Sequence, residues 1–388
     1  MRTRIYIFFL LYTAIFLVFY INGCVRNNAG AIPGLKNTVL KPYQDQLLSI
    51  AFETATKIPT NPHIKSRCLA QQTVVENCFE LDQPQKALEY IEQIENWRKQ
   101  FCYGELALYC AKHGATKSDI QYFLNLANQV PEQSQEWRKD LVDEKIAQTK
   151  AYMERTRQKT DAFDPNSFDK EMENIQKLVS TENFDSVQIS LGAYTELYNR
   201  YYSNVEYRDQ IENKIKSSWD KMPILIRINF LMDMAGFALD HKDKAKALEL
   251  VNDAQKMKDT STWPIRYEIP LIAKLAEFHF LAGDIDGANK ELKKSLDMFD
   301  KNQEKIVNID KAGILRSIAE ACQKTVDTTS SRNIYERAID AGIENPNSLP
   351  RAEDLSATCC SMALHKIEPG EELLNKIKKI ESALSDPW

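Results

Sequence analysis

The residues that could carry out chemistry in this sequence are eight cysteines, five histidines and scattered carboxylates. Catalysis and metal binding require such groups at defined spacings, as in the HExxH pair of histidines in zinc peptidases. Cys360 with His365, and His63 with Cys68, bring a thiol and an imidazole close together in the sequence. Neither has the paired spacing that is typical of a zinc site. We therefore predict no metal site and no cofactor.

The sequence motifs that would predict an enzyme do not occur either. There is no nucleophile elbow, phosphate-binding loop, dinucleotide fingerprint or paired carboxylate motif. The stretch AGDIDGANK contains Asp284 and Asp286, but it lacks the loop length and the terminal glutamate of a calcium-binding loop. We predict that the protein is not an enzyme and that this stretch is a turn between two helices.

The first residues of the chain predict export. Residues 5–21, IYIFFLLYTAIFLVFYI, carry no charge and follow Arg2 and Arg4, an arrangement typical of a secretory signal. The next residues, INGC, resemble the bacterial lipobox, in which the cysteine is lipidated. The resemblance implies a signal peptide at 1–23, a lipid anchor on Cys24 and attachment to a bacterial membrane facing the periplasm or the cell exterior. An uncleaved transmembrane helix is the alternative. A bilayer span takes about 20 residues, and residues 5–21 are close to the short limit of that length.

The residues that follow predict a tether and then a helical body. Residues 25–42 contain glycine, proline and asparagine without helical periodicity, so we expect 24–45 to be flexible. Glycine is scarce in the whole chain, while alanine, leucine, lysine and glutamate are common, which favours helix. The formal net charge of −5 comes with no basic stripe, so we predict no nucleic-acid partner.

The helical body contains a repeating pattern. Residues 271–299, LIAKLAEFHFLAGDIDGANKELKKSLDMF, place Leu275, Ala276, His279, Gly283 and Ala288 at the intervals of a helical hairpin. This pattern resembles the tetratricopeptide repeat, in which small residues let two antiparallel helices approach closely and a glycine ends the first helix. Weaker matches recur over about residues 64–384. Ala235, Ala319 and Ala107 fall at the place of Ala276, Cys78 and Cys110 at that of His279, and Ala247 and Ala87 at that of Ala288.

We therefore predict an all-α fold, an irregular solenoid of tetratricopeptide-like hairpins that follows the N-terminal segment. The break at Asp164-Pro165 suggests N-terminal repeats at 46–160 and C-terminal repeats at 161–388, and Pro223 is an alternative boundary. Cys78 and Cys110 fall at one repeat position, where a buried thiol acts as a small apolar residue. A disulfide from Cys68 or Cys78 to Cys102 or Cys110 is the alternative in an oxidising compartment.

Aromatic residues are the candidate partner-binding groups. Tyr194, Tyr198 and Tyr201 follow the spacing of one helix face, with Tyr202 beside them, and Trp263 lies in a long loop between repeats. Tyrosine and tryptophan are favoured at protein interfaces, and core packing is the alternative role for these rings.

The repeat resemblance implies binding of protein or peptide partners without chemistry. We predict a membrane-tethered lipoprotein that acts as a scaffold or adaptor in the cell envelope. One alternative is a lipoprotein that captures a solute or glycan beside an outer-membrane transporter, through an exposed aromatic pocket around Tyr198 and Trp263. Another is an envelope enzyme built as a helical toroid, which would need converging carboxylates.

Overall fold

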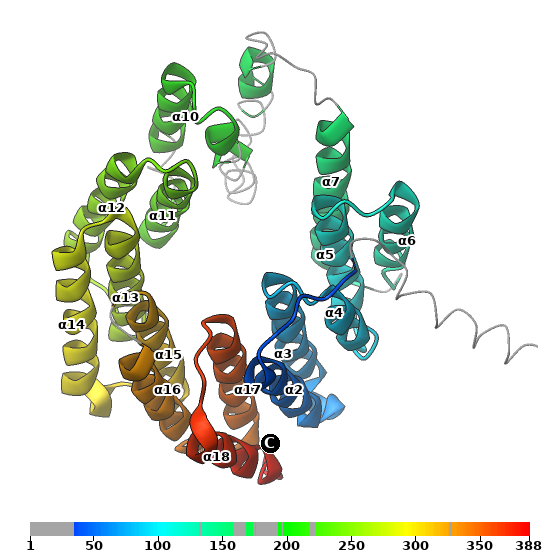
Figure 1. Ribbon diagram of the computed structural model, residues 1–388, viewed down its shortest axis with the longest axis vertical. Helices are drawn as coiled ribbons and strands as arrows, with labels where there is room; N and C mark the ends of the chain where they lie inside the picture. The colour runs from blue at the N-terminus through cyan, green and yellow to red at the C-terminus, as the bar shows by residue number, and fades with distance from the viewer. Residues whose placement is uncertain are drawn as a thin grey trace, which may run out of the picture. The chain divides into compact units, whose positions relative to one another are not determined.

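The computed structural model describes residues 35–131, 134–157, 168–173, 175, 193–195, 197–217, 222–325 and 328–388. Among these residues the regular structure is helical, and they form no β-strand (Figure 1). The predicted all-α fold is confirmed. The predicted signal peptide and Cys24 lie outside the described residues. No helix in the described part of the chain combines the length and the apolar character that a bilayer span requires.

The chain divides into two compact units. Unit 1 comprises Met1–Lys159, Asn347–Lys366 and Lys378–Trp388, and unit 2 comprises Thr160–Pro346 and Ile367–Ile377. The border after Lys159 is close to the predicted border after residue 160. The C-terminal segments differ from the prediction, because most of residues 347–388 belong with the N-terminal helices and not with the C-terminal repeats.

Unit 1 is built from short-turn hairpins. α3 packs against α4, α5 packs against α6, and α5 also contacts α7. Proline at the first position begins α2 and α4, where its missing N–H costs nothing. The hydroxyl of Thr116 caps α6 by accepting a hydrogen bond from the Asp119 amide. The helices of unit 1 are α2 (Pro42–Lys57), α3 (Thr60–Glu80), α4 (Pro84–Ile91), α5 (Arg98–Lys112), α6 (Lys117–Ala127), α7 (Glu136–Arg157) and α17 (Ser348–Leu364).

Helix α17, near the C-terminus of the chain, completes the core of the first helices by packing against α2 and α3. The amide of Gln44 in α2 donates a hydrogen bond of 2.9 Å to the carbonyl of Ala363, 319 residues later. The hydroxyl of Ser356 donates one of 2.9 Å to the carbonyl of Ala51. These buried polar contacts fix the register of α17 on α2, and its packing against α2 and α3 places α17 in unit 1.

The segment before α2 corrects the predicted tether. Leu35 is fully buried, and the amide of Thr38 donates to the carbonyl of Asp82 at 2.9 Å. The side chain of Gln83 donates to the carbonyl of Thr38 at 2.9 Å. Residues 35–41 are therefore fastened to the turn between α3 and α4, and α2 begins at Pro42. The prediction of a flexible tether is wrong for residues 35–45.

Unit 2 repeats the hairpin arrangement with α11 on α12, α13 on α14 and α15 on α16. The first helices of these hairpins contact one another, α11 with α13 and α13 with α15, so they form one layer (Figure 1). The predicted repeat alanines are buried, among them Ala235, Ala276 and Ala319. The helices of unit 2 whose full bounds the structure describes are α10 (Val205–Ser217), α11 (Ile224–Asp240), α12 (Lys244–Asp259), α13 (Ile265–Ala282), α14 (Ile285–Asn302), α15 (Asn308–Thr325) and α16 (Thr328–Ile343), and α18 (Gly370–Ser382) begins in unit 2 and ends in unit 1.

The turn between α13 and α14 shows how the repeat pattern ends one helix and begins the next. Gly283 has φ +95° and ends α13 in the left-handed conformation that glycine adopts freely. Asp284 caps α14, because its carboxylate accepts from the Gly287 amide at 3.0 Å. The same carboxylate lies 2.9 Å from Nδ1 of the buried His279. The AGDIDGANK stretch is thus a turn between helices, as predicted.

Gly283→Ala is expected to lower the free energy of unfolding by about 1–2 kcal/mol, because a side chain disfavours the left-handed backbone. A Cβ atom at residue 283 would meet only Lys244 Cδ at 3.9 Å, so the cost lies in the backbone and not in a clash. Denaturant unfolding would measure this decrease in the free energy of unfolding. Gly313→Ala, inside α15, is the control and should leave stability unchanged or raise it by up to about 1 kcal/mol. Equal effects of the two substitutions would contradict this account.

Candidate functional site

The tyrosines predicted to bind a partner lie inside unit 2. Tyr194, Tyr198 and Tyr202 are at most 5% exposed, and Tyr201 is half-buried. The Tyr201 ring packs edge-on against Phe168, with 5.1 Å between ring centres. Their helical spacing reflects a face that is turned to the core, so we reassign these residues from partner binding to packing.

Polar contacts also tie Tyr202 to the α11–α12 turn. The hydroxyl of Tyr202 donates to the Asp243 carboxylate at 3.0 Å, and its ring stacks on His241 at 4.4 Å. Arg208 reaches the same carboxylate at 3.5 Å. Burial raises the pKa of Tyr202 and of Tyr198. Both phenols therefore stay neutral at physiological pH, and the Tyr202 hydroxyl serves the structure of the turn.

Trp263, the other predicted partner-binding residue, is half-buried against the core of unit 2. Its indole N–H donates to the carbonyl of Lys258 at 2.9 Å, which closes the C-terminal end of α12. Because Tyr198 is fully buried, the exposed aromatic pocket expected around Tyr198 and Trp263 is not formed by these residues.

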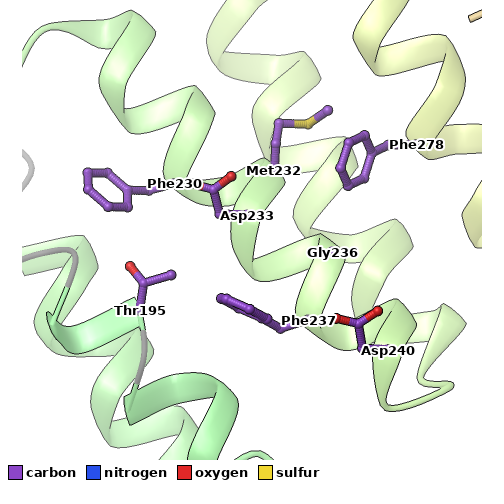
Figure 2. Close-up of a pocket in the computed structure, with 8 residues that line it drawn as sticks. All are labelled: Thr195, Phe230, Met232, Asp233, Gly236, Phe237, Asp240 and Phe278. Carbon is purple, nitrogen blue, oxygen red and sulfur yellow. The ribbon is translucent and has the colours of Figure 1, made fainter. Parts of the chain in front are cut away.

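A hollow of about 440 Å³ opens instead on α11 and α13 (Figure 2). Phe230, Asp233, Phe237 and Asp240 follow one another at intervals of three or four residues, which places them on one face of α11. Gly236 leaves room beside them, since a Cβ atom there would lie 4.0 Å from the Phe278 ring. The residues that line the hollow are Thr195, Phe230, Met232, Asp233, Gly236, Phe237, Asp240 and Phe278.

The carboxylates of this hollow form no ion pair with the described residues. The side-chain carboxylate of Asp233 has no hydrogen-bond or ion-pair partner among the described residues, and neither has that of Asp240. Burial raises the pKa of Asp233, and the positive charge of Lys274 opposes this shift only in part. A carboxylate between Phe230 and Phe237 favours a cation, because aromatic faces and the carboxylate both attract positive charge.

A second hollow, of about 410 Å³, continues the surface onto α15. It shares Phe278 with the first hollow and is lined by side chains of α11, α13 and α15, among them Asn229, Lys274 and Glu320. Glu277 on its wall forms an ion pair with Lys324. The two hollows together form a surface along the first helices of three hairpins, which we call the α11–α15 surface.

The sequence contained one sign of this surface. In α11, ILIRINFLMDMAGFALD, Asp233 is an acidic residue within an otherwise apolar stretch, flanked three residues before and four after by Phe230 and Phe237. Because the other face of α11 is buried in the core, the charge of Asp233 indicates a stripe of this helix that faces solvent. The tyrosine spacing suggested a different surface, so this stripe was not predicted.

The cysteines show no sign of reactive or metal-binding chemistry in the described part of the chain. All seven cysteines there are buried, and Cys68, Cys78, Cys102, Cys110 and Cys359 carry free thiols. Burial raises the pKa of Cys78, Cys110 and Cys359 to about 12, so these thiols are protonated and unreactive near neutral pH. Within the described residues, no group of three histidine, cysteine or acidic side chains is arranged to hold a metal ion.

Comparison with known proteins provides no family for the chain. No protein-family model matches it, and a search of the curated proteins finds no match.

Proposed function

We propose that this protein is a lipid-anchored adaptor of the bacterial cell envelope, which binds a protein or peptide partner along the α11–α15 surface. The observation that carries the proposal is the pair of hollows joined at Phe278 on one helix layer. The tetratricopeptide-like pattern supports partner binding, and the INGC sequence at 21–24 supports the anchor on Cys24. The partner would make many shallow contacts along the layer.

The chemistry of the first hollow specifies the kind of partner. Its walls are mainly apolar, from Phe230, Met232, Phe237 and Phe278, and its charges are the carboxylates of Asp233 and Asp240. A lysine or arginine side chain matches both features, because its aliphatic stem packs on rings while its charged end meets a carboxylate. We expect the partner segment to carry a basic residue beside apolar ones.

Site-specific photo-cross-linking in cells tests the proposal. A photoreactive amino acid at Asn229, an exposed residue of the α11–α15 surface, should cross-link a defined envelope protein. The same amino acid at Lys293, exposed on α14 outside this surface, is the control. Capture of that protein from residue 229 and not from residue 293 would support the adaptor function. The same products at both positions, or none at residue 229, would overturn it.

As the pH falls, partner binding should begin to weaken at a higher pH than it would if Asp233 had the ordinary pKa of an aspartate. Burial raises the pKa of Asp233, so this carboxylate is protonated earlier as the pH falls and then loses its attraction for a cation. By linkage, binding of a cation lowers this pKa and releases a proton. Partner affinity measured across the acidic range should depend on pH in the wild type and should lose this pH dependence in Asp233→Asn. Unchanged pH dependence in Asp233→Asn would exclude Asp233 as the titrating group.

A further inference from the structure

A second unexplained group of charged residues lies in unit 1, where two arginines pack on Trp97. The guanidinium carbon of Arg98 lies 4.9 Å from the centre of the Trp97 ring. The guanidinium carbon of Arg138 lies 5.9 Å from the Trp97 ring and 5.2 Å from the Trp137 ring. The two indoles are 5.5 Å apart at an angle of 78°, so Arg138 occupies the angle between them.

Neither arginine forms an ion pair within the described part of the chain. The guanidinium of Arg98 donates to the side-chain oxygen of Gln72, a neutral acceptor. The guanidinium of Arg138 makes no hydrogen bond to the described residues, and its Nε is buried without an acceptor. Other arginines of the chain do have a carboxylate within reach, as Arg67, Arg200, Arg208 and Arg337 show.

The electrostatics of this site leave positive charge uncompensated. Burial lowers the pKa of Arg98, and the charge of Arg138 lowers it further. Of the neighbouring acids, Glu95 lies 3.4 Å from Arg67 and Glu105 lies 2.9 Å from Lys145, while Glu76 accepts from Gln72 and offsets the positive charge of Arg98 only in part. A half-buried guanidinium without an acceptor is costly, and a bound anion would remove that cost.

We propose that Arg138, with Arg98 as a second positive charge, binds an oxyanion, either a carboxylate or a phosphate. The planar guanidinium offers paired N–H donors that match both groups. Trp137 is 50% exposed and Leu141 is 37% exposed, so the ligand can cover these apolar surfaces beside its charged group. The site lies in unit 1, and its existence does not depend on the α11–α15 surface.

Anion titration of the full chain in detergent tests the proposal. Inorganic phosphate and acetate are added separately at constant ionic strength with sodium chloride, and tryptophan fluorescence is recorded because Trp97 and Trp137 border the site. We expect a saturable change with at least one of the two anions. Saturation by phosphate alone or by acetate alone identifies which oxyanion the site prefers.

Variants assign the effect to Arg138. Arg138→Gln should weaken anion binding at least about tenfold, and Arg138→Lys should weaken it less, because lysine keeps the charge without the paired donors. Arg337→Gln is the matched control: Arg337 also packs on a ring, 5.6 Å from the centre of Phe299, but it has Asp300 as its partner. If Arg138→Gln does not fold by circular dichroism, Arg98→Gln replaces it. No saturable change in the wild type, or equal binding in the folded variant, would overturn the proposal.

Discussion

Asp233→Lys is expected to weaken partner binding at least about thirtyfold. Loss of one member of a desolvated charge pair costs about 2 kcal/mol or more, and the new lysine also repels a basic partner residue. Asp233 lines the hollow on α11 and α13, and its carboxylate forms no ion pair with the described residues. Calorimetric titration of the purified variant with the partner captured from residue 229 would measure the loss.

The matched control for this charge reversal is Asp297→Lys. Asp297 is exposed on α14, outside the residues that line either hollow, so its reversal makes the same change in net charge at a different place. We expect this variant to bind within about threefold of the wild type. An equal loss in both variants would show that binding depends on overall charge and not on the hollow. Asp233→Asn should fall between the wild type and Asp233→Lys.

Met362→Ala is expected to lower the free energy of unfolding of unit 1 by about 2–5 kcal/mol. Met362 is fully buried in α17, the helix that packs against α2 and α3. Removing its side chain leaves a cavity that fixed neighbouring helices can fill only in part. Denaturant unfolding measures the loss of stability, and hydrogen exchange should show faster opening of α2 as well as of α17.

Leu69→Ala is the control for this core substitution. Leu69 lies on α3 in the same unit and is 47% exposed, so its truncation should cost less than about 1 kcal/mol. Faster exchange confined to α17 in Met362→Ala would contradict the packing of α17 on α2. A loss from Leu69→Ala as large as that from Met362→Ala would contradict the assigned burial.

The helical hairpins of this protein could be predicted because their determinants are local. Gly283 ends α13 and Asp284 begins α14, and each does so through contacts within a few residues. The burial of Cys78 and Cys110 followed from the same periodicity. The packing of α17 on α2 could not be predicted in this way, since an apolar helix face shows that a partner exists but not which helix it is.

The candidate site was harder to predict for a related reason. Tyr194 and Tyr198 have a spacing that fits a helix face equally well when that face is in the core or in solvent, and the structure places it in the core. Asp233 and Phe278 come together only because α11 and α13 lie side by side, although they are far apart in sequence. The residue pattern of one helix does not show which residues of another helix will lie beside it.

The central claim is that the hollow around Asp233 recognises a basic residue beside apolar ones. Selection of displayed random peptides on the full chain tests it most directly. We predict that enriched peptides carry lysine or arginine next to aliphatic or aromatic residues, and that they lose binding to both Asp233→Lys and Phe278→Ala. Enrichment of acidic peptides, or of peptides that bind these two folded variants as tightly as the wild type, would contradict the claim.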